Sequence, residues 1–219
     1  MASFNISIRT GGSLQSYGEP SDFVSCFVGV ITCTDDDTGE VTKVGRVTAV
    51  RVHAGLAQDA GAPLFDVCDS YSHELATLHG LLYEPDSYRF REPLMRRFEA
   101  MDSDLLVLDY VVLNPRWREL KLGLLAVRKF VDLVGGGCGL VVSFIAPLRY
   151  DAAPLIRVPK SWLPSHAGEE ERRAALVRLR GYFRLMGFER LGRSWYYALP
   201  LNLIVPGATE LLGGEPGGP

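Results

Sequence analysis

Residues Leu105 to Leu148 read LLVLDYVVLNPRWRELKLGLLAVRKFVDLVGGGCGLVVSFIAPL, and this stretch decides the fold. Leu105 to Leu113 is an apolar run rich in β-branched residues, which is typical of a strand buried on both faces. Apolar residues then recur at helical spacing from Leu120 to Val134, and Leu140 to Ile145 reads as a second buried strand. A strand, a helix and a strand within about forty residues predict a βαβ-like unit with two parallel strands.

The turn that joins the first strand to the helix has the features of an anion site. A tight turn that opens a helix leaves backbone N–H groups unpaired, and these groups and the helix dipole favour an anion such as a phosphate. Arg118 and Lys121 add positive charge, and Gly123 allows the backbone to approach a ligand closely. The alternative interpretation is a solvated strand-to-helix turn that happens to carry basic residues.

This turn resembles the acyl-CoA loop of the GNAT N-acetyltransferase superfamily, whose usual pattern is (Arg or Gln)-x-x-Gly-x-(Gly or Ala). A second similarity lies at Leu179 to Arg190, LRGYFRLMGFER, which resembles the family's helix ending in Tyr-x-x-x-Gly-Phe before a closing strand, here Trp195 to Leu201. Together the two similarities cover residues 105–201. Two positions differ: Lys121 stands where the loop has its first Gly, and Phe183 stands where many members carry a Tyr general acid.

The resemblance implies an α/β fold of GNAT type, with a mixed, mostly antiparallel sheet, a central parallel strand pair and flanking helices. Residues 1–205 are expected to form a single domain, and the Gly/Pro-rich tail at 206–219 is expected to be disordered. The implied activity is acyl-CoA-dependent N-acyl transfer, which moves an acetyl group from acetyl-CoA to a primary amine. The residues expected to bind the cofactor are Val112, Leu113, Arg118, Glu119, Leu120, Lys121, Leu122 and Gly123.

The candidate catalytic residues are Asp109, His73 and Tyr182. Asp109 interrupts a buried strand, where an unpaired charge is costly, and the resemblance implies a carboxylate base near this place. His73 and Asp69 are spaced i,i+4 in an expected helix, so with Glu74 they predict a polar group that could line a substrate pocket or act as a base. A local surface pair is the alternative. The resemblance suggests Tyr182 as an acid, although it lies one residue before the family's Tyr position.

The first half of the chain predicts three strands and two helices. The hairpin formed by the second and third strands precedes the helices, whereas in a typical GNAT fold two helices follow the first strand. Either the order is rearranged here or these elements are misplaced. The long Pro-containing segment 149–168 is expected to lie near the site, and its Trp162 contacts substrate or fills the edge of the core. The expected elements are strands at Phe4–Ile8, Asp22–Thr34 and Val41–His53, and helices at Leu64–Leu82 and Glu92–Met101.

Composition narrows the class of protein. The 219 residues carry a net charge of −3, which gives no sign of general nucleic-acid binding. The four cysteines form no C-x-x-C pair and are expected to be buried free thiols in a reducing cytoplasm, with no metal site. Neither a secretory signal nor a membrane-spanning run is expected. The predicted partners are acyl-CoA and an amine-bearing acceptor, and the oligomeric state stays open, a homodimer included.

Two other hypotheses compete with the acyltransferase. Lys121 and Phe183 motivate a catalytically degenerate GNAT-fold protein that binds a ligand or a partner protein without transferring an acyl group. The other is a fold unrelated to GNAT, in which a hairpin domain is joined to a βαβ unit. A structure in which the strands at 105–113 and 140–145 are not parallel neighbours would favour it.

Overall fold

A computed structural model describes residues 2–11, 18–118, 120–148, 156–164 and 168–201. Its strands form one seven-stranded sheet in the order β1-β2-β3-β4-β5-β7-β6. Only β4 and β5 are parallel, and all other neighbouring strands in this sheet are antiparallel. The strands are β1 (Ala2–Gly11), β2 (Val24–Asp35), β3 (Val41–Val52), β4 (Asp104–Leu113), β5 (Cys138–Phe144), β6 (Glu189–Arg190) and β7 (Tyr196–Pro200).

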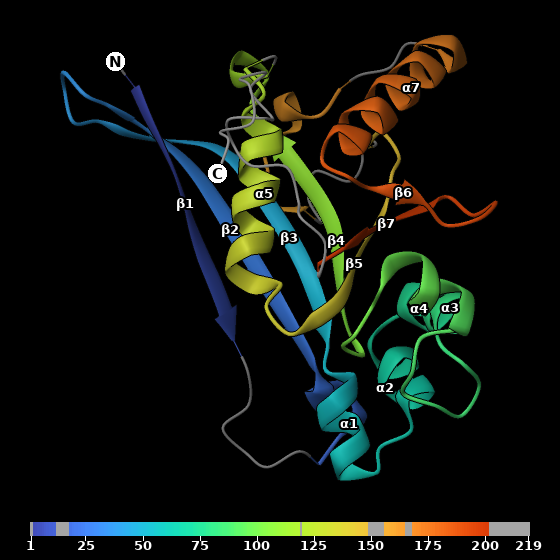
Figure 1. Ribbon diagram of the computed structural model, residues 1–219. Coiled ribbons are helices and arrows are strands. Elements are labelled where there is room, and N and C mark those ends of the chain that lie inside the picture. The colour runs from blue at the N-terminus through green and yellow to red at the C-terminus, as the bar shows by residue number, and fades with distance from the viewer. Residues whose placement is uncertain (1, 12–17, 119, 149–155, 165–167, 202–219) are drawn as a thin grey trace, which may run out of the picture.

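Helices cover both faces of the sheet. In Figure 1, α5 lies along β2–β4, α1–α4 gather at one end of the sheet, and α7 lies beyond β5 and β7. This architecture confirms the predicted fold class, a mixed and mostly antiparallel sheet with a central parallel pair. The helices are α1 (Ala54–Ala60), α2 (Leu64–Tyr71), α3 (His73–Leu82), α4 (Glu92–Phe98), α5 (Leu122–Val134) and α7 (Glu169–Leu185), with 3-10 turns at η1 (Pro20–Phe23), η2 (Pro115–Trp117) and η4 (Lys160–Trp162).

The predicted βαβ unit is confirmed, and its two strands are parallel neighbours rather than the separate strands that would have favoured a fold unrelated to GNAT. β4 and β5 are parallel neighbours from Asp104–Cys138 to Leu108–Ser143. Helix α5 begins at Leu122 rather than Leu120 and ends against Gly135. Its first buried residue is Leu122, whereas Leu120 is exposed, so the apolar face facing the sheet starts where the helix does.

The order of elements in the first half differs from that of a typical GNAT fold, which is the first of the two alternatives considered above. β1 pairs with β2 along ten residues, and the β2–β3 hairpin follows directly. All four helices α1–α4 come after β3, in the connection that returns the chain to β4. Because β3 and β4 are antiparallel neighbours, the connection between them contains α1–α4 and does not need to cross over the sheet.

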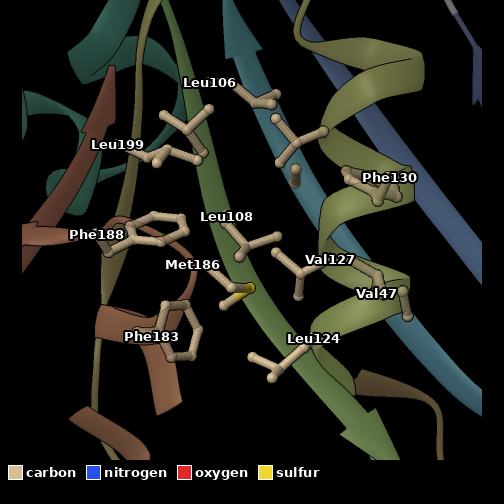
Figure 2. Packing of buried hydrophobic residues seen from close by; sticks show 14 of the residues in the cluster. Val47, Leu106, Leu108, Leu124, Val127, Phe130, Phe183, Met186, Phe188 and Leu199 are labelled. Carbon is tan, nitrogen blue, oxygen red and sulfur yellow. The ribbon is translucent and has the colours of Figure 1, made fainter. Parts of the chain in front are cut away.

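Alternating residues of the central strands fill two hydrophobic cores on opposite faces. Leu106 and Leu108 of β4 pack against α5 and the end of α7, whereas Leu105 and Val107 pack toward α1–α4. Figure 2 shows Leu108 between Val127 of α5 and the group formed by Phe183, Met186 and Phe188. Since both faces are buried, a slip of one residue in β4 would exchange the two cores, which fixes the register.

A polar network joins β3, α1 and β4 at the end of the sheet where β4 begins. The Asp104 carboxylate accepts hydrogen bonds from Arg51 Nε at 3.1 Å and from the Gly55 amide at 3.1 Å. His53 Nδ1 lies 3.5 Å from the same carboxylate, and its Nε2 meets Ser25 Oγ at 2.8 Å. Burial raises the pKa of Asp104, but the hydrogen bonds from His53, Gly55 and Arg51 outweigh it and hold the pKa below its ordinary value.

We expect Asp104→Asn to lower the free energy of unfolding at pH 7 by about 2 kcal/mol, because it leaves Arg51 half-buried without its charge partner. The folded pKa is depressed, so this stabilisation is present above the unfolded pKa of about 4 and is lost as the pH falls through the folded value. Urea unfolding of both proteins from pH 7 to pH 3 measures the difference, which should shrink below pH about 4. Asp59→Asn, on the exposed side of α1, is the control. A difference that does not change with pH would contradict this account.

Candidate functional site

The two parallel strands stop pairing halfway along β4. Their ladder ends at Leu108 and Ser143, while β4 continues to Leu113. The Ser143 hydroxyl donates a hydrogen bond of 2.9 Å to the Leu108 carbonyl, so a side chain meets the last paired residue of β4. Beyond this point, no described residue of β5 pairs with β4, so that edge of the strand has no neighbouring strand among the described residues.

A β-bulge lies at the same position. Thr48 of β3 pairs with Tyr110 and Ala49 pairs with Leu108, so Asp109 is the extra residue of β4. A bulge redirects the side chain of its extra residue. The negative charge of Glu74, in α3, raises the pKa of Asp109. The Asp109 side chain therefore faces the side of the sheet that carries α1–α4, at the point where β4 and β5 separate.

The backbone of β4 beyond the bulge alternates between two directions. The Asn114 amide donates to the Val44 carbonyl at 2.8 Å, so Val112, two residues earlier, also directs its polar groups at β3. Val111 and Leu113 direct theirs to the side that β5 has left. The Leu113 carbonyl is already occupied, because the Arg118 side chain donates to it from Nε at 3.3 Å. Of the two β4 residues expected to bind the cofactor, Leu113 directs its backbone groups away from β3 and Val112 directs them toward it.

Asp109 combines solvent access with an unfavourable setting for its charge. Its side chain is exposed to water, yet the surrounding protein removes enough hydration to raise its pKa to about 7. Desolvation is the larger cause, the negative charge of Glu74 adds to it, and the Thr48 hydroxyl opposes it. A carboxyl group with a pKa near neutrality that remains in contact with water can act as a general base.

The charges of Asp109 and Glu74 each act on a tyrosine. The Tyr71 hydroxyl lies 3.1 Å from Cys26 Sγ, and burial, Cys26 and the charge of Asp109 all raise the pKa of Tyr71. Burial and Glu74 raise the pKa of Tyr196, whose ring meets Phe144 edge to face at 5.5 Å between centroids. Both phenols therefore stay protonated at neutral pH. Sequence patterns gave no signal for these residues, because they come from four separate elements.

The expectation that all four cysteines are buried is wrong for Cys26. Cys33, Cys68 and Cys138 are buried free thiols, whereas Cys26 is exposed beside Tyr71. Its strand position explains the difference, since Phe27 on the opposite face packs on the α5 core while Cys26 lies on the face that the helices leave partly open.

The single helix predicted over Leu64–Leu82 is two helices. Ser72 has an extended conformation, with φ −165° and ψ 151°, and its hydroxyl accepts a hydrogen bond from the Leu75 amide at 3.2 Å. Ser72 is thus the N-cap of α3, an arrangement that serine favours. Asp69 and His73 consequently do not share a helix face, and that prediction is wrong. His73 is the exposed first residue of α3, and Glu74 is the member of the predicted group that acts on Asp109.

Lys121, the residue before α5, has a left-handed conformation. Its φ of 53° and ψ of 10° lie in the region that side chains other than glycine avoid, and no side chain caps the helix here. This is the position at which the family resemblance expects the first Gly of the loop. The first-turn amides of Leu122 and Gly123 precede the intrahelical bonds, which start with the Leu124 amide donating to the Lys121 carbonyl at 3.0 Å.

Tyr182 lies against the start of α5. A methyl group added at Gly123 would lie 3.5 Å from the Tyr182 hydroxyl oxygen and 3.5 Å from the Leu113 side chain. Burial raises the pKa of Tyr182, and the Leu124 amide acts in the opposite direction. The neighbouring Phe183 is a core residue, 5.1 Å from Phe188 in an edge-to-face contact. Tyr182 thus belongs with the predicted cofactor loop.

The segment from Ile156 to Leu163 covers the end of β4. Trp162 is buried, and it packs with Val112, Ile156 and Leu163, so it fills the core edge as one of the two alternatives held. The Arg118 guanidinium bridges the carbonyls of Leu113 and Trp162, and burial lowers the pKa of Arg118. Arg118 is therefore used within the chain. The predicted loop residue Glu119 and residues 149–155 and 165–167 of the long segment lie outside the described residues.

The described residues were also compared with what a metal site and a membrane-spanning helix require. No group of three or more His, Cys, Asp or Glu side chains among these residues could hold a metal ion. The acidic turn after β2 is a hairpin tip, in which Asp35 accepts hydrogen bonds from the amides of Asp37 and Thr38 at 2.9 Å. No helix within the described residues has the length and apolar character needed to cross a bilayer.

Comparisons with known proteins do not identify the family of this chain. No family model matches the chain, and no curated protein matches it. One similar solved structure is that of Drosophila melanogaster polyamine N-acetyltransferase, an enzyme that catalyses the formation of N-acetylagmatine. The identity is 13% and the TM-score is 0.32, over 78% of this chain and 74% of that chain. This likeness is too weak to assign the chain to a family, so the fold is defined by its own strand order and pairing.

We expect Lys121→Gly to raise the free energy of unfolding by about 1 kcal/mol, because glycine adopts the left-handed conformation without steric cost. For a protein of this length that corresponds to a rise in Tm of about 2–4 °C, measurable by calorimetry. Lys121→Ala is the matched control, since it removes the same side chain but keeps the Cβ, and it should give no comparable gain. Equal Tm values for the Gly and Ala variants would contradict the conformational explanation.

Asp109 should make the protein less stable as the pH rises toward neutrality. Its folded pKa of about 7 is raised, so the stabilisation relative to the unfolded chain is complete below about pH 4 and is lost as the pH rises through 7. Asp109→Asn should therefore become progressively more stable than the wild type between these values, as measured by urea unfolding. In Glu74→Gln the same transition should move to lower pH, because a like charge is removed. If the difference in free energy of unfolding between Asp109→Asn and the wild type does not change with pH, the pKa of Asp109 is not raised.

Proposed function

We propose that this protein is an acyl-CoA-dependent N-acyltransferase that moves an acetyl group from acetyl-CoA to a primary amine. The observation that carries the proposal is the separation of β4 from β5 at Leu108 and Ser143. The bulged Asp109 and the start of α5 both follow the point where the ladder ends, which supports a site with Asp109 as the base and the first amides of α5 as the anion-binding groups.

Acetyl-CoA would enter along the edge of β4 that β5 leaves. The Leu122 and Gly123 amides and the positive end of α5 suit the pyrophosphate, and Lys121 adds a positive charge beside them. The backbone amides of Val111 and Leu113, directed at the same opening, suit the thioester carbonyl. Arg118 would act indirectly, since its hydrogen bonds to Leu113 and Trp162 fix the shape of the loop.

The transfer requires that the amine lose two protons. Asp109 would take the first from the ammonium form of the acceptor, which leaves a free amine to attack the carbonyl carbon. A nitrogen–carbon bond forms, the carbon–sulfur bond breaks, and the departing thiolate receives a proton. Tyr182, protonated at neutral pH and next to the start of α5, is the proposed donor. The second amine proton then restores the Tyr182 hydroxyl, and Asp109 releases the first proton to solvent. Much of the acceleration would come from holding the thioester beside the amine.

Thermal unfolding with and without acetyl-CoA tests the cofactor half of the proposal. A ligand at about one hundred times its dissociation constant adds about 2.7 kcal/mol of stability, which should raise Tm by roughly 5–10 °C. Adenosine alone should give no comparable rise. Lys121→Glu should weaken binding about tenfold through reversal of the charge beside the helix start, and Lys129→Glu, exposed farther along α5, should not. Unchanged affinity in Lys121→Glu would mean that the loop assignment is wrong.

Turnover tests the catalytic half with an amine screen. Asp109→Asn should lower kcat/KM by about 10²–10³ and remove the inflection that the wild type should show near pH 7. Acetyl-CoA should still raise the Tm of this variant, because the Asp109 side chain faces α1–α4 and the proposed cofactor loop lies at the start of α5. Turnover that is the same in wild type and variant would exclude Asp109 as the base.

A second candidate function is a binding module without transfer. The observation that favours it is the segment from Ile156 to Leu163, which is packed on Val112 and held by Arg118 and by the Tyr110 hydroxyl, 3.4 Å from the Ile156 carbonyl. The end of β4 is thus partly covered by the protein itself. No rise in Tm at millimolar acetyl-CoA, together with no turnover of any amine, would favour this candidate over the acyltransferase.

A further inference from the structure

We propose that Ser25 is a nucleophile that attacks small carboxylic esters, with His53 as its general base and Asp104 as the residue that orients His53. This second site lies where β2 and β4 begin and β3 ends, at the opposite end of β4 from the predicted cofactor loop. Its three side chains are called the serine cluster below. The proposal is independent of the acyltransferase function, because it needs neither acetyl-CoA nor Asp109.

Strand register places two members of the serine cluster side by side on one face of the sheet. Val52 of β3 pairs with Leu105 of β4, and both side chains pack in the core toward α1–α4. His53 and Asp104 are the next residues on these two strands beyond that pair. Because side chains alternate between the faces of a sheet, His53 and Asp104 point to the face opposite α1–α4.

The distances between the three side chains are those of a nucleophile, a base and a group that orients the base. His53 Nε2 lies 2.8 Å from Ser25 Oγ, and His53 Nδ1 lies 3.5 Å from Asp104 Oδ2. Ser25 pairs with Arg51 in the β2–β3 ladder, so it is diagonally across from His53. A hydroxyl, an imidazole and a carboxylate in this order form the catalytic triad of serine hydrolases, which occurs on unrelated folds.

The ionisation of Asp104 determines where the protons of the serine cluster lie. Burial raises its pKa, but the hydrogen bonds from His53, Gly55 and Arg51 outweigh burial, so at neutral pH the carboxylate is ionised and can only accept hydrogen bonds. The proton of a neutral His53 ring therefore lies on Nδ1, and Nε2 carries a lone pair. The Ser25 hydroxyl must then donate to Nε2. This is the direction in which His53 can take the hydroxyl proton as Ser25 attacks.

The base and the carboxylate are held in place by the surrounding chain. The His53 amide donates to the Phe23 carbonyl at 2.9 Å, and the His53 carbonyl accepts from the Ala57 amide at 3.0 Å. Arg51 Nη2 donates to the Asp104 carboxylate at 2.8 Å. The positions of His53 and Asp104 are thus fixed by contacts within the protein, as activation of a nucleophile requires.

Ser25 and His53 are within reach of a small molecule. Both residues are half-buried, and 19% of the His53 side chain is exposed. The ladder between β1 and β2 ends at Gly11 and Cys26, one residue before it would reach Ser25. This partial burial suits an ester with a small acyl group.

The expected reaction is hydrolysis through an acyl-serine. The Ser25 oxygen bonds to the carbonyl carbon while His53 takes the hydroxyl proton, and the ester carbon–oxygen bond breaks as His53 gives this proton to the leaving oxygen. Water, deprotonated by His53, then attacks the acyl-serine, which releases the carboxylic acid and restores Ser25. Arg51 is engaged by Asp104 and by the Gly136 carbonyl, so it is not assigned to the oxyanion. We therefore expect esters with a good leaving group, such as a phenolate, rather than amides.

A fluorophosphonate probe tests the nucleophile on the full chain without acetyl-CoA. Attack by Ser25 forms an oxygen–phosphorus bond and expels fluoride, so mass spectrometry of peptides should find the adduct on Ser25. Ser25→Ala should abolish the labelling. Ser21→Ala, which removes an exposed serine of η1, is the matched control and should label at the rate of the wild type. Hydrolysis of p-nitrophenyl acetate at pH 8 should follow the same pattern.

Two further variants separate the roles of His53 and Asp104 from support of the fold. His53→Ala should label about a hundredfold more slowly. Added imidazole should restore part of this rate, but none in Ser25→Ala. Asp104→Asn should lower the maximal rate of labelling by about a hundredfold and leave the reversible affinity for the probe unchanged, because an amide that donates to Nδ1 favours the ring tautomer with its proton on Nε2.

The outcomes distinguish the serine cluster from the acyltransferase site. Labelling of Ser25 that depends on His53 would uphold the inference, whether or not the protein transfers acetyl to an amine. An unlabelled wild type, an adduct on another residue, or equal labelling rates in His53→Ala and the wild type would overturn it and leave the acyltransferase proposal standing. Circular dichroism and Tm would confirm that each variant folds, and Ser25→Ala decides the question by itself if His53→Ala does not.

Discussion

The structure depends on the point at which two parallel strands stop pairing. β4 and β5 are held together over five residue pairs, and at Leu108 and Ser143 the ladder ends. On the other side of β4, the bulge at Asp109 breaks the pairing with β3 at the same level. From Leu105 to Leu108, β4 is paired on both sides and its side chains fill the two cores. From Asp109 to Leu113 it pairs only with β3 among the described strands, so its other backbone groups could bind a ligand.

The acidic group beside this opening is assembled from distant parts of the chain. Ser72 ends α2 and caps α3, and the resulting turn brings Glu74, in the first turn of α3, toward β4. The negative charge of Glu74 sits at the helix N-terminus, where the helix dipole favours it. The dipole thereby offsets part of the repulsion between Glu74 and Asp109.

The turn into α5, which we propose as the cofactor loop, shows how a residue other than glycine can adopt a left-handed conformation. Lys121 adopts the left-handed conformation that glycine usually supplies, so the turn into α5 keeps its shape at some cost in strain and gains a positive charge. Arg118 stabilises the same turn from the other side through the Leu113 and Trp162 carbonyls. The rearranged order of the first half leaves this region unaffected, because α1–α4 are inserted between β3 and β4 at the far end of the sheet.

The sequence by itself determined the βαβ unit and the hairpin, because doubly buried strands and amphipathic helices have local patterns of apolar residues, and the family resemblance added the helix and the closing strand that follow. It also identified Asp109 as an anomalous charge in a buried strand. It missed the break at Ser72, because the apolar spacing continues through the cap. Only the tertiary structure decided which residues meet Asp109. Strand register, one extra residue in β4 and the turn into α3 bring Glu74, Thr48 and Tyr71 together, and the energies that fix these features come from packing between residues far apart in the chain.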